Sequence, residues 1–573
     1  MSTNKKIAEI FYQMSEILEI QGQVWESRAY QKAARTIETF SKDVAEIYKK
    51  QGLEGLMEIP GVGKGLAEKI GQFAAEGRIE KHQELLKSIP KGLLDIISVQ
   101  GLGPKKASKL YKELKIDNIE KLESEAKDGR IRELEGFGEK SEKDILKGIE
   151  IFKKGQERML LGEALPLAIE IANRLKSLKE VESIEIAGSI RRRKETIGDI
   201  DILIISKNPA KIMDFFVSMP NVDFVQGKGD TKSSVTLKEG LDCDLRVLDP
   251  KSFGAALAYF TGSKEHNIVM RQLAIKKGWK LSEYGLFDKK NNIIAGKTEE
   301  EIYKKFGMAY IEPELRENAG EIEASQKGEL PNLIKYNSLK GDLHMHTKWS
   351  DGVYTTEEMV KAAIAKRYTY IAITDHSKSE RIANGMDEKR VLEYFREIEK
   401  LQEKYPQIKI LKGSEISIQA DGGLDYSGKI LKELDLIVGS VHSRFKSPEA
   451  EMTKRIIKAL DTGLVTVLGH PTGRLIGQRE QYAVNLDKVF EAAARNNVAL
   501  EINSSPQRLD LNDYNAKKAL GFGCKFAVNT DAHSTDQLDF IHLGIGQARR
   551  GWLEEKDVVN SWGWEKFEKV LKK

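Results

Sequence analysis

The spacing of hydrophobic positions divides the chain into stretches with different predicted elements. From residue 5 to about 150, apolar residues such as Ile7, Ile10 and Phe11 recur at helical spacing, and glycines separate the short helices that this spacing predicts. Between about 160 and 315, the β-rich runs ESIEIAG, DIDILIIS, SSVTL and LDCDLRVL alternate with helical segments. The pattern therefore predicts a helical N-terminal part followed by a part that contains a sheet.

A third pattern begins at residue 341. Short apolar runs alternate there with helical segments, and the runs are YIAITDH, IKILKGSEI, LDLIVGSVH, VTVLGH, VALEINSS and KFAVNTDAH. Strand and helix alternation of this length predicts a parallel α/β barrel. Polar residues gather at the C-terminal end of each run, which is the end where such barrels place active sites. The polar stretch at 311–340 lacks sustained periodicity, so we expect a linker in front of the barrel.

A glycine-rich motif occurs three times in the helical part. Its copies are IPGVGKGLAEKI at 59–70, VQGLGPKKASKL at 99–110 and LEGFGEKSEKDI at 134–145. Each copy has an apolar residue, a Gly-x-Gly turn and a helix start, which is the helix-hairpin-helix pattern that aims backbone N–H groups at a phosphate. We therefore expect contacts with the DNA backbone that grip without reading sequence. The predicted contact residues are Gly61, Gly63, Gly101, Gly103 and Lys105.

Composition and charge narrow the class of protein only slightly. The 573 residues are 40% hydrophobic and 31% charged, as in a globular protein of several domains. Because 92 basic residues nearly balance 88 acidic ones, attraction to phosphate has to come from local patches. The two cysteines, Cys243 and Cys524, favour a reducing compartment, and no window resembles a signal peptide or a membrane span. We expect a cytoplasmic protein without membrane contact.

The segment AGSIRRRKETIGDIDILI contains the first candidate catalytic group. Asp199 and Asp201 lie two apart on a predicted strand, so both carboxylates point to the same face. Two carboxylates about 4 Å apart repel by about 4 kcal/mol at an effective dielectric of about 20, which divalent cations between them would relieve. Asp244 in the later strand CDLRV is a candidate third carboxylate. The turn at 188–189 and the arginines at 191–193 suit a triphosphate.

Three ordered blocks resemble those of the family X DNA polymerases, the group that includes DNA polymerase beta. The blocks are GSIRRRKETIGDID, YFTGSKEHNIVMRQLA at 259–274 and SEYGLF at 282–287. The resemblance implies that Asp199, Asp201 and Asp244 bind two catalytic Mg²⁺ ions and that Asp244 helps to activate the primer 3′-hydroxyl. It also implies a set of nucleotide-binding residues, namely Gly188, Ser189, Arg192, Gly198, Tyr259, Phe260, Gly262, Asn267 and Arg271.

The resemblance gives several of these residues separate roles. Tyr259 and Phe260 would lie against the incoming sugar and exclude a 2′-hydroxyl. Asn267 and Arg271 would reach the minor-groove side of the new base pair. Selection of the nucleotide is therefore expected to depend on the second block.

The first glycine-rich copy resembles the deoxyribose-phosphate lyase region of the same family. The match puts Lys69 at the position of the Schiff-base nucleophile, which needs a depressed pKa to attack a sugar aldehyde. The alternative is a solvent-facing helical lysine in a DNA-binding motif, and both interpretations stay open.

Six of the nine histidines lie after residue 340 at strand ends or in the turns that follow. They occur in the motifs DLHMHT, TDH, VHS, GHP and DAH, together with acidic residues that include the glutamate of SEI. A lone histidine is more often structural than a metal ligand, but six at the same end of successive strands predict a metal centre. The predicted ligands are His344, His346, Asp351, His376, Glu415, His442, His470, Asp531 and His533.

These motifs resemble the polymerase-and-histidinol-phosphatase (PHP) domain, a distorted barrel with a trinuclear metal site. The resemblance implies three ion sites, made by His344, His346, Glu415 and Asp531, by Glu415, His442 and His470, and by Asp351, His376 and His533. Such ligands suit Mn²⁺ or Zn²⁺, and the sequence does not choose between them. Clustered cations imply hydrolysis of phosphoesters. Fusion to a polymerase predicts a 3′-to-5′ exonuclease, with removal of 3′-phosphates or cleavage at abasic sites as further options.

We therefore predict a multidomain fold with both α+β and α/β parts. The predicted segments are a helical DNA-binding domain resembling the lyase domain (1–90), a fingers-like helix-hairpin-helix subdomain (91–155), a nucleotidyltransferase palm with a mixed sheet (156–250), a nucleotide-selection subdomain (251–315), a linker (316–340) and a distorted (β/α)7 barrel (341–573).

The leading hypothesis is a monomeric DNA-repair polymerase that fills short gaps in gapped or primed DNA with dNTPs and processes 3′ ends in its barrel. The alternative is a small-molecule phosphatase of the PHP type whose N-terminal half only binds nucleic acid. That alternative gives no role to the three aspartates or to the YFTG block. A scaffold that holds DNA ends without chemistry would leave twelve candidate metal ligands unexplained.

Overall fold

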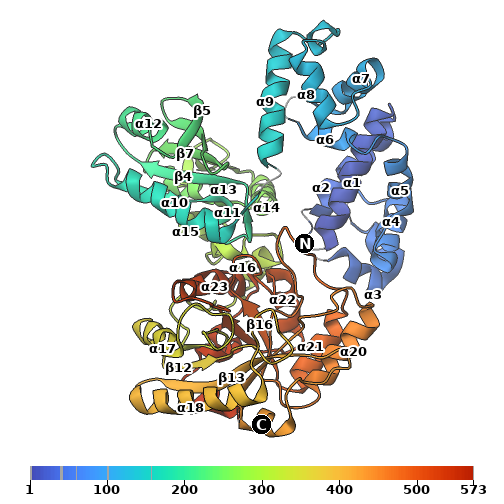
Figure 1. Cartoon of the computed structure of the whole chain (residues 1–573). Helices are drawn as coiled ribbons and strands as arrows, with labels where there is room; N and C mark the ends of the chain where they lie inside the picture. Colours follow the sequence, from blue (N-terminus) through green and yellow to red (C-terminus); the bar gives the residue numbers. More distant parts are fainter. Residues whose placement is uncertain are drawn as a thin grey trace. The chain divides into compact units, whose positions relative to one another are not determined.

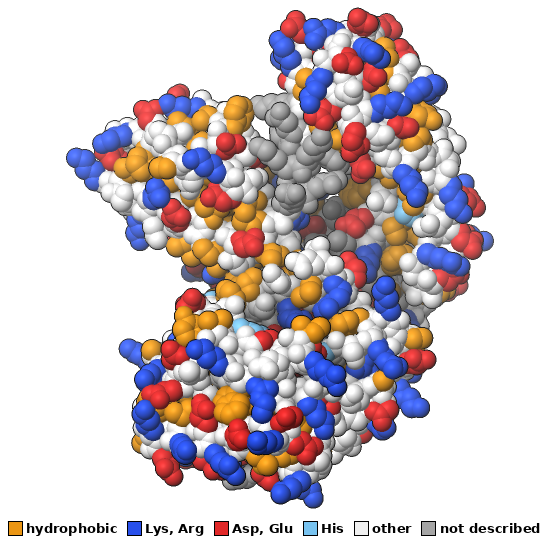
Figure 2. All heavy atoms as spheres, in the orientation of Figure 1, with side chains coloured by type: hydrophobic (Ala, Val, Ile, Leu, Met, Phe, Trp, Pro, Cys, Tyr) orange, Lys and Arg blue, Asp and Glu red, His pale blue; other side chains and the backbone are white. Residues whose placement is uncertain are grey.

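The computed structural model describes residues 3–38, 40, 43–59, 61–99, 102–155 and 158–571 (Figure 1). The chain forms two compact units. Unit 1 consists of Met1–Met159, Ile171–Ser189 and Gly198–Glu329, and unit 2 of Leu160–Glu170, Ile190–Ile197 and Leu330–Lys573. Among the described residues, no helix is both long and apolar enough to cross a bilayer. On the face drawn in Figure 2, basic and acidic side chains are interspersed, as the near balance of charge leads one to expect.

The first part of unit 1 is helical, as its hydrophobic spacing predicted. Ile7, Phe11 and Met14 of the first helix are completely buried in one cluster, and a second cluster is built from Leu93 to Ile149. The helices are α1 (Thr3–Ile20), α2 (Val24–Glu38), α3 (Val44–Met57), α4 (Lys64–Glu76), α5 (Glu80–Lys87), α6 (Leu93–Ser98), α7 (Pro104–Leu114), α8 (Ile119–Lys127), η1 (Ile131–Glu133) and α9 (Glu139–Gly155).

Each glycine-rich copy leads into a helix, which confirms the helix-hairpin-helix prediction. Gly63 and Gly103 are the N-cap residues of α4 and α7, and α9 starts directly after Gly138. A Cβ built on Gly63 or Gly103 would meet nothing within 4 Å, so a phosphate can approach the first N–H groups of these helices. Gly61 has a φ of +83°, in the region that glycine adopts without strain. Gly101 lies outside the described residues.

The middle of the chain forms the mixed sheet that we predicted. Its strands are β2 (Ser183–Ile186), β4 (Asp199–Ile205), β5 (Val222–Lys228), β6 (Lys232–Leu237) and β7 (Asp242–Leu248), in the order β2-β4-β7-β6-β5. The β4 and β7 pair is parallel, and the other pairs are antiparallel. The same stretch of sequence also contains β1 (Met159–Leu160), which pairs with β3 (Thr196–Ile197), and the helices α10 (Leu161–Lys176), α11 (Gly188–Arg191) and α12 (Pro209–Val217). The run that became β5 was not predicted, because this edge strand is mostly exposed.

The YFTG block connects two helices of the next subdomain. It forms the end of α13 (Phe253–Thr261), and α14 (Lys264–Lys276) follows at once. Gly262 between them has a φ of +73°, which a residue with a side chain rarely adopts. The remaining elements are β8 (Lys280–Ser282), β9 (Gly285–Phe287) and β10 (Ile293–Ala295), which form an antiparallel sheet, and α15 (Glu299–Lys305).

The segment 316–340 is not the linker that we predicted. The elements η2 (Pro313–Leu315) and α16 (Glu321–Lys327) fold with unit 1, and the side chains of Arg316 and Glu321 are 0% exposed. From Leu330 the chain belongs to unit 2, where Ile334 is completely buried. The hydrophobic pattern missed this packing because several of the buried side chains here are charged.

Unit 2 contains the predicted parallel barrel, which is nearly closed. Its strands are β11 (Gly341–Asp342), β12 (Tyr370–Ile373), β13 (Lys409–Ser417), β14 (Leu436–Ser440), β15 (Val467–Leu468), β16 (Ala499–Asn503) and β17 (Phe526–Asn529), paired in chain order. A parallel bridge between Met345 and Ala532 links the segments that follow the first and last strands. The other elements are α17 (Thr356–Ala365), α18 (Glu388–Lys404), α19 (Gly428–Glu433), α20 (Glu449–Leu460), α21 (Leu486–Arg495), α22 (Asp513–Gly521), η3 (Asp536–Phe540), α23 (Ile541–Arg550), η4 (Glu555–Asp557), η5 (Val559–Ser561) and α24 (Trp564–Leu571).

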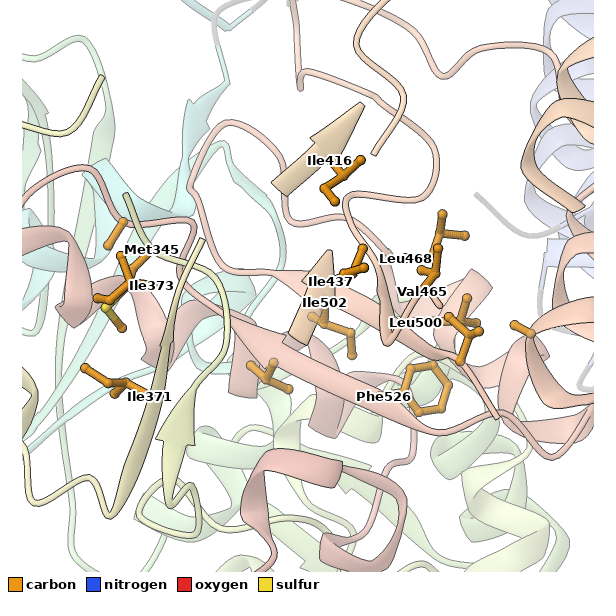
Figure 3. Close-up of a cluster of buried hydrophobic side chains, with 14 of the residues drawn as sticks. Met345, Ile371, Ile373, Ile416, Ile437, Val465, Leu468, Leu500, Ile502 and Phe526 are labelled. Atoms are coloured by element: carbon orange, nitrogen blue, oxygen red, sulfur yellow. The ribbon is translucent and has the colours of Figure 1, made fainter. Parts of the chain in front are cut away.

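The barrel strands are buried on both faces. Ile371 and Ile373 belong to one buried cluster, and Tyr370 and Ala372 of the same strand belong to another. Figure 3 shows part of the first cluster, to which successive strands contribute aliphatic side chains. Burial on both faces explains why these strands appear in the sequence as continuous apolar runs. Since all strands run parallel, the polar residues at their C-terminal ends are brought to one end of the barrel.

Candidate functional site

The nine predicted metal ligands of the barrel converge at the C-terminal ends of its strands. Three groups of side chains could each hold a metal ion, since within each group the candidate ligand atoms lie within 4.8 Å of one another. The groups are His346 with Asp351, His376 and His533; His344 with His346 and Asp531; and His376 with Glu415 and His442. His470 joins the last group, since its Nε2 lies 2.9 Å from Glu415 Oε1. The structure therefore brings these nine side chains together at one end of the barrel.

Glu415 lies at the centre of this cluster and is 1% exposed. Its carboxylate is 2.9 Å from His442 Nε2, 3.0 Å from His376 Nδ1 and 3.4 Å from His344 Nε2. Burial alone would raise the pKa of Glu415, but the surrounding imidazoles hold it well below its usual value. This carboxylate is placed to be shared between neighbouring cations.

Asp531 and Asp351 complete the cluster on its other side. Asp531 Oδ1 lies 3.1 Å from His346 Nε2, and Asp351 Oδ1 lies 3.4 Å from His533 Nε2. Asp531 has a φ of +54°, which is unusual for a residue with a side chain and often marks a functional site. The backbone is thus bent so that this carboxylate faces the imidazoles.

The donor atoms fit divalent cations. His344 Nε2 and His346 Nδ1 are buried and have no hydrogen-bond partner within the described part of the chain, which is costly unless another ligand satisfies them. Burial, together with His533 and His376, lowers the pKa of His346 to about 3, so its imidazole is neutral as ligation requires. Mixed imidazole nitrogen and carboxylate oxygen donors suit transition-metal ions or Zn²⁺.

Glu501 supports the cluster and was missed by the sequence analysis. It is 0% exposed in β16, its Oε1 lies 2.7 Å from His344 Nδ1, and its Oε2 accepts the His470 N–H at 2.7 Å. A carboxylate behind a ligating histidine fixes which ring nitrogen faces the metal. The signal was an acidic residue inside the apolar run VALEIN, where a charge needs a buried partner.

Asp375 has a similar role for the loop that carries Asp351. Its buried carboxylate accepts hydrogen bonds from the N–H and hydroxyl of Thr347 and from the N–H and hydroxyl of Ser350. Burial raises the pKa of Asp375, while these bonds act in the opposite direction. The loop is therefore held by a polar side chain that lies directly before His376.

The three predicted aspartates of unit 1 lie on neighbouring parallel strands. Asp199 and Asp201 are on β4, and Asp244 on β7 is directly opposite Asp201 in the register. A Cβ on Gly188 would lie 2.5 Å from Asp201 Oδ2, so only glycine allows this carboxylate to approach the turn. Asp244 accepts a hydrogen bond from Ser234 Oγ at 2.5 Å. The carboxylates of these adjacent strands therefore lie on one side of the sheet.

Basic side chains lie beside this group of aspartates. Lys232 Nζ lies 3.1 Å and Arg246 Nη2 3.3 Å from Asp244 Oδ2. The Arg246 guanidinium also lies 4.3 Å from the centre of the Phe260 ring, which links the carboxylates to the YFTG block. Ser189 Oγ is buried without a hydrogen-bond partner among the described residues, as expected for a group that contacts a ligand.

Three of the residues predicted to select the nucleotide line one pocket at α13 and α14. Tyr259, Asn267 and Arg271 line it together with His266 and Tyr303. Asn267 Nδ2 donates to the Tyr259 carbonyl at 2.7 Å, and the Tyr259 and Phe260 rings pack edge to face with centres 5.1 Å apart. These contacts fix the two aromatic residues relative to the start of α14.

Arg192 and Gly198 have different surroundings. Arg192 belongs to the segment Ile190–Ile197 of unit 2, where its carbonyl accepts a hydrogen bond from Arg550 Nη1 at 2.6 Å. A Cβ on Gly198 would lie 2.8 Å from Arg158 Nη1, so this glycine allows the arginine to pass close to the backbone.

Lys69 is partly exposed on α4. Its Nζ donates to the Gly65 carbonyl at 3.0 Å and lies 5.8 Å from the centre of the Tyr30 ring. This geometry is that of a helical lysine bonded to its own helix. Lys105 is exposed in the first turn of α7, beside the open helix start.

Comparison with known families gives matches to several parts of the chain. The matching families are described as DNA polymerase beta thumb (residues 256–317), PHP domain (342–505), helix-hairpin-helix domain (2–79) and SAM-like helix-hairpin-helix tandem (93–150).

Relatives with curated names match the whole chain or one half of it. The DNA polymerase/3′-5′ exonuclease PolX of Bacillus subtilis (strain 168) is 37% identical over 573 residues, which are 99% of either chain. DNA polymerase lambda of Rattus norvegicus is 25% identical over 55% of this chain and 56% of its own length. A probable phosphatase of Thermoanaerobacter sp. (strain X514) is 34% identical over 38% of this chain and 89% of its own. The similarity to phosphatases thus covers a minority of the chain.

Proposed function

The chain belongs to the family X DNA polymerases that carry a PHP domain, and on this premise we propose which residues perform its reactions. It is an enzyme with DNA polymerase and 3′-to-5′ exonuclease activity, and it depends on divalent metal ions. The alternative of a small-molecule phosphatase does not account for most of the chain, because the phosphatase relative matches only 38% of it.

One observation carries the assignment of residues. Acidic side chains converge in two separate groups, one on the paired strands β4 and β7 and one at the C-terminal end of the barrel. Neighbouring carboxylates repel, and buried imidazole nitrogens without a hydrogen-bond partner are costly, so both groups would be stabilised by bound cations. We therefore assign one group to nucleotide addition and the other to hydrolysis.

Asp199, Asp201 and Asp244 are the proposed ligands of two Mg²⁺ ions in the polymerase site. When bound, these ions would make the primer 3′-hydroxyl easier to deprotonate and would offset charge on the triphosphate. Asp244, which Ser234 orients, faces the hydroxyl, and Ser189 and Arg192 contact the triphosphate. Gly188 leaves room for Asp201, Gly198 leaves room for Arg158, and Gly262 adopts a φ of +73°; the resemblance assigns all three glycines to the nucleotide site.

Selection of the nucleotide is assigned to α13 and α14. Asn267 holds the Tyr259 carbonyl, and this bond keeps the aromatic pair of Tyr259 and Phe260 where a ribose 2′-hydroxyl would collide with it. Asn267 and Arg271 read the minor-groove edge of the new pair, where every correct pair offers acceptors. The shared pocket of Tyr259, Asn267 and Arg271 supports this assignment.

The barrel cluster is the proposed exonuclease site, with Mn²⁺ or Zn²⁺ in up to three positions. Bound there, the ions would supply hydroxide near neutral pH and stabilise negative charge on the scissile phosphate. His344, His346, Glu415 and Asp531 hold one position, Glu415, His442 and His470 a second, and Asp351, His376 and His533 a third. Glu501 keeps His344 in the orientation that presents Nε2.

The DNA substrate is proposed to be a short gap or a primed end, gripped by the helix-hairpin-helix motifs. Gly61, Gly63, Gly103 and Lys105 contact backbone phosphates, and Gly101 is assigned with them from the sequence. We further propose that the chain acts as a monomer. Lyase chemistry at Lys69 and cleavage at abasic sites remain secondary proposals that the resemblance alone supports.

The test is a gapped duplex with a 5′-labelled primer, incubated with Mg²⁺ or Mn²⁺ with and without dNTPs. We expect extension with dNTPs and shortening without them. Asp199→Ala should abolish extension only, and His344→Ala or Glu415→Ala should abolish shortening only. The controls are Asp214→Ala, an exposed aspartate of α12, and His542→Ala, a barrel histidine outside the cluster, and both should retain the two activities. The assignments are wrong if the Asp199 and His344 variants retain both activities.

A further inference from the structure

A buried polar network joins the nucleotide-selection helix α14 to the segment that follows the subdomain. His266 on α14 is 2% exposed, and both of its ring nitrogens are bonded. Its Nδ1 lies 2.7 Å from Glu321 Oε1, and its Nε2 lies 3.0 Å from the Tyr303 hydroxyl. Because a carboxylate only accepts, Nδ1 carries a proton toward Glu321, and Nε2 makes the second hydrogen bond with the Tyr303 hydroxyl. The imidazole is therefore fixed in orientation.

The Glu321 carboxylate is in turn fixed by hydrogen bonds from the backbone. It is 0% exposed and accepts the N–H of Asn318 at 2.9 Å and the N–H of Ala319 at 2.7 Å. These bonds fix the carboxylate in the turn before α16. The His266 ring is thus anchored to a rigid backbone and not to a mobile side chain.

A second set of hydrogen bonds holds the N-cap residue of the same helix. Ser263, the N-cap of α14, donates its N–H to the Arg316 carbonyl at 3.0 Å, and its Oγ accepts the His266 N–H at 3.2 Å. Arg316 is 0% exposed and bonds to Glu299 Oε1 at 2.5 Å and to the Ile311 carbonyl at 2.9 Å. Both connections end at the first turn of α14.

This turn borders the pocket assigned to the incoming nucleotide. His266 directly precedes Asn267, which holds the Tyr259 carbonyl at 2.7 Å, and His266 and Tyr303 line the same pocket as Tyr259 and Arg271. Charged groups are an expensive way to pack a helix, since apolar side chains of similar volume stabilise as well or better. A network of fixed hydrogen bonds does, however, define position and angle more narrowly than apolar contacts.

We propose that His266, Glu321 and Arg316 are positioning residues of the polymerase reaction. They fix the start of α14, so that Asn267 and Tyr259 stand at the correct distance to exclude ribonucleotides and bind deoxyribonucleotides. The segment 313–327, which we call the brace, thereby holds the sugar-selecting residues in position. This inference rests on the proposed function, which assigns Tyr259 and Asn267 to the nucleotide.

The test is single-nucleotide insertion into gapped DNA with the full-length protein, measured with dCTP and with rCTP. In Glu321→Gln an amide N–H₂ replaces one carboxylate oxygen and faces an N–H donor. At least one charge-assisted hydrogen bond to this side chain is therefore lost. We expect KM for dCTP to rise about tenfold and the preference for dCTP over rCTP to fall about tenfold, the size of one such bond. The value of kcat should change little, because the chemical groups are untouched. Exonuclease activity of the same preparation should be unchanged, which shows that the barrel site is intact.

A milder variant and a matched control accompany it. Tyr303→Phe removes only the hydroxyl that bonds His266 Nε2, and we expect the same changes at about threefold, as for a neutral hydrogen bond. Glu142→Gln is the matched control, because it removes the charge of another buried carboxylate, which accepts the N–H and the Nε–H of Arg132. It should leave the preference for dCTP over rCTP unchanged. If Glu321→Gln does not fold, Tyr303→Phe decides.

Two outcomes overturn the inference, and they differ from failure of the proposed function. Unchanged KM and sugar preference in Tyr303→Phe and Glu321→Gln, while Asn267→Ala alters both, would remove the brace but keep the assigned pocket. An equal loss of extension and exonuclease activity, without a change in sugar preference, would reduce the network to a structural role. If Asn267→Ala itself leaves KM and sugar preference unaltered, the nucleotide assignment fails together with the brace.

Discussion

Replacing Glu501 by glutamine tests how the barrel cluster is supported. The carboxylate faces only donors, because Oε1 accepts from His344 Nδ1 and Asn529 Nδ2, and Oε2 accepts from the His470 N–H and Asn503 Nδ2. An amide of the same shape presents one N–H₂ group in place of an oxygen. Either orientation of the new amide therefore turns a donor toward two other donors.

The structure gives the size of the effect. Two bonds to a charged acceptor are lost, which is a cost of about 3 to 6 kcal/mol in folding free energy. When the amide faces His344, the imidazole is driven to the tautomer with its proton on Nε2, the nitrogen assigned to the metal. Loss of such a supporting carboxylate lowers metal affinity by roughly 10 to 100-fold.

The assay is a titration of metal-stripped protein with Mn²⁺. Shortening of a 5′-labelled strand and heat of binding in calorimetry are recorded for Glu501→Gln and for the unchanged chain. We expect both midpoints to move to roughly 10 to 100-fold higher Mn²⁺, with activity recovered at saturation. Extension with Mg²⁺ should be unaffected. Glu397→Gln is the control, because Glu397 accepts a hydrogen bond from Trp349 and not from a ligand.

The reasoning is refuted if the Glu501→Gln titration superimposes on that of the unchanged chain. It is also refuted if activity falls at every Mn²⁺ concentration while the calorimetric midpoint stays in place. In the first case the carboxylate would not orient His344, and in the second it would act only on folding or on catalysis.

Further predictions concern stability and the metal ions. Gly254→Ala should lower the free energy of unfolding by about 1 to 3 kcal/mol in urea, because its Cβ would collide with the Thr298 backbone, whereas Gly227→Ala, with open space around it, should not. Asp375→Asn should lower the free energy of unfolding by about 1 to 3 kcal/mol, because an amide cannot accept all the hydrogen bonds that Thr347 and Ser350 donate. It should reduce strand shortening but not extension. An equal loss of both activities would contradict this prediction. Adding Mn²⁺ at about 100 times its Kd to chelator-treated protein should stabilise unit 2 by about 2.7 kcal/mol in thermal unfolding, and no shift would count against a barrel metal site.

The sequence predicted those parts of the fold whose buried residues are apolar. The runs that became β12 and β14 are buried throughout, so hydrophobicity alone revealed them and their order predicted a barrel. The segment at 316–340 and Glu501 were missed for the same physical reason. Arg316, Glu321 and Glu501 are completely buried but charged, and a pattern of apolar positions treats charge as exposure.

The candidate ligand residues could be named from the sequence, but their geometry could not. Motifs such as DLHMHT and TDH indicate candidate ligands, because imidazoles in that number at strand ends have few other uses. Strand register, by contrast, depends on pairing between distant segments. Only the structure shows that Asp244 lies opposite Asp201, and that Glu415 stands between His442, His470 and His376.

The two acidic groups differ in burial, and this difference has consequences for how each holds its ions. His344 is 0% and Glu415 1% exposed, whereas Asp201 and Asp244 are half-buried and Asp199 is exposed. A buried carboxylate and imidazole cluster is unstable without compensating positive charge, so cations bound there would contribute to folding as well as to chemistry. Half-exposed carboxylates remain partly hydrated, so they would hold a cation less tightly. On the proposed assignment, burial would therefore favour resident ions in the barrel and exchangeable ions at the open sheet.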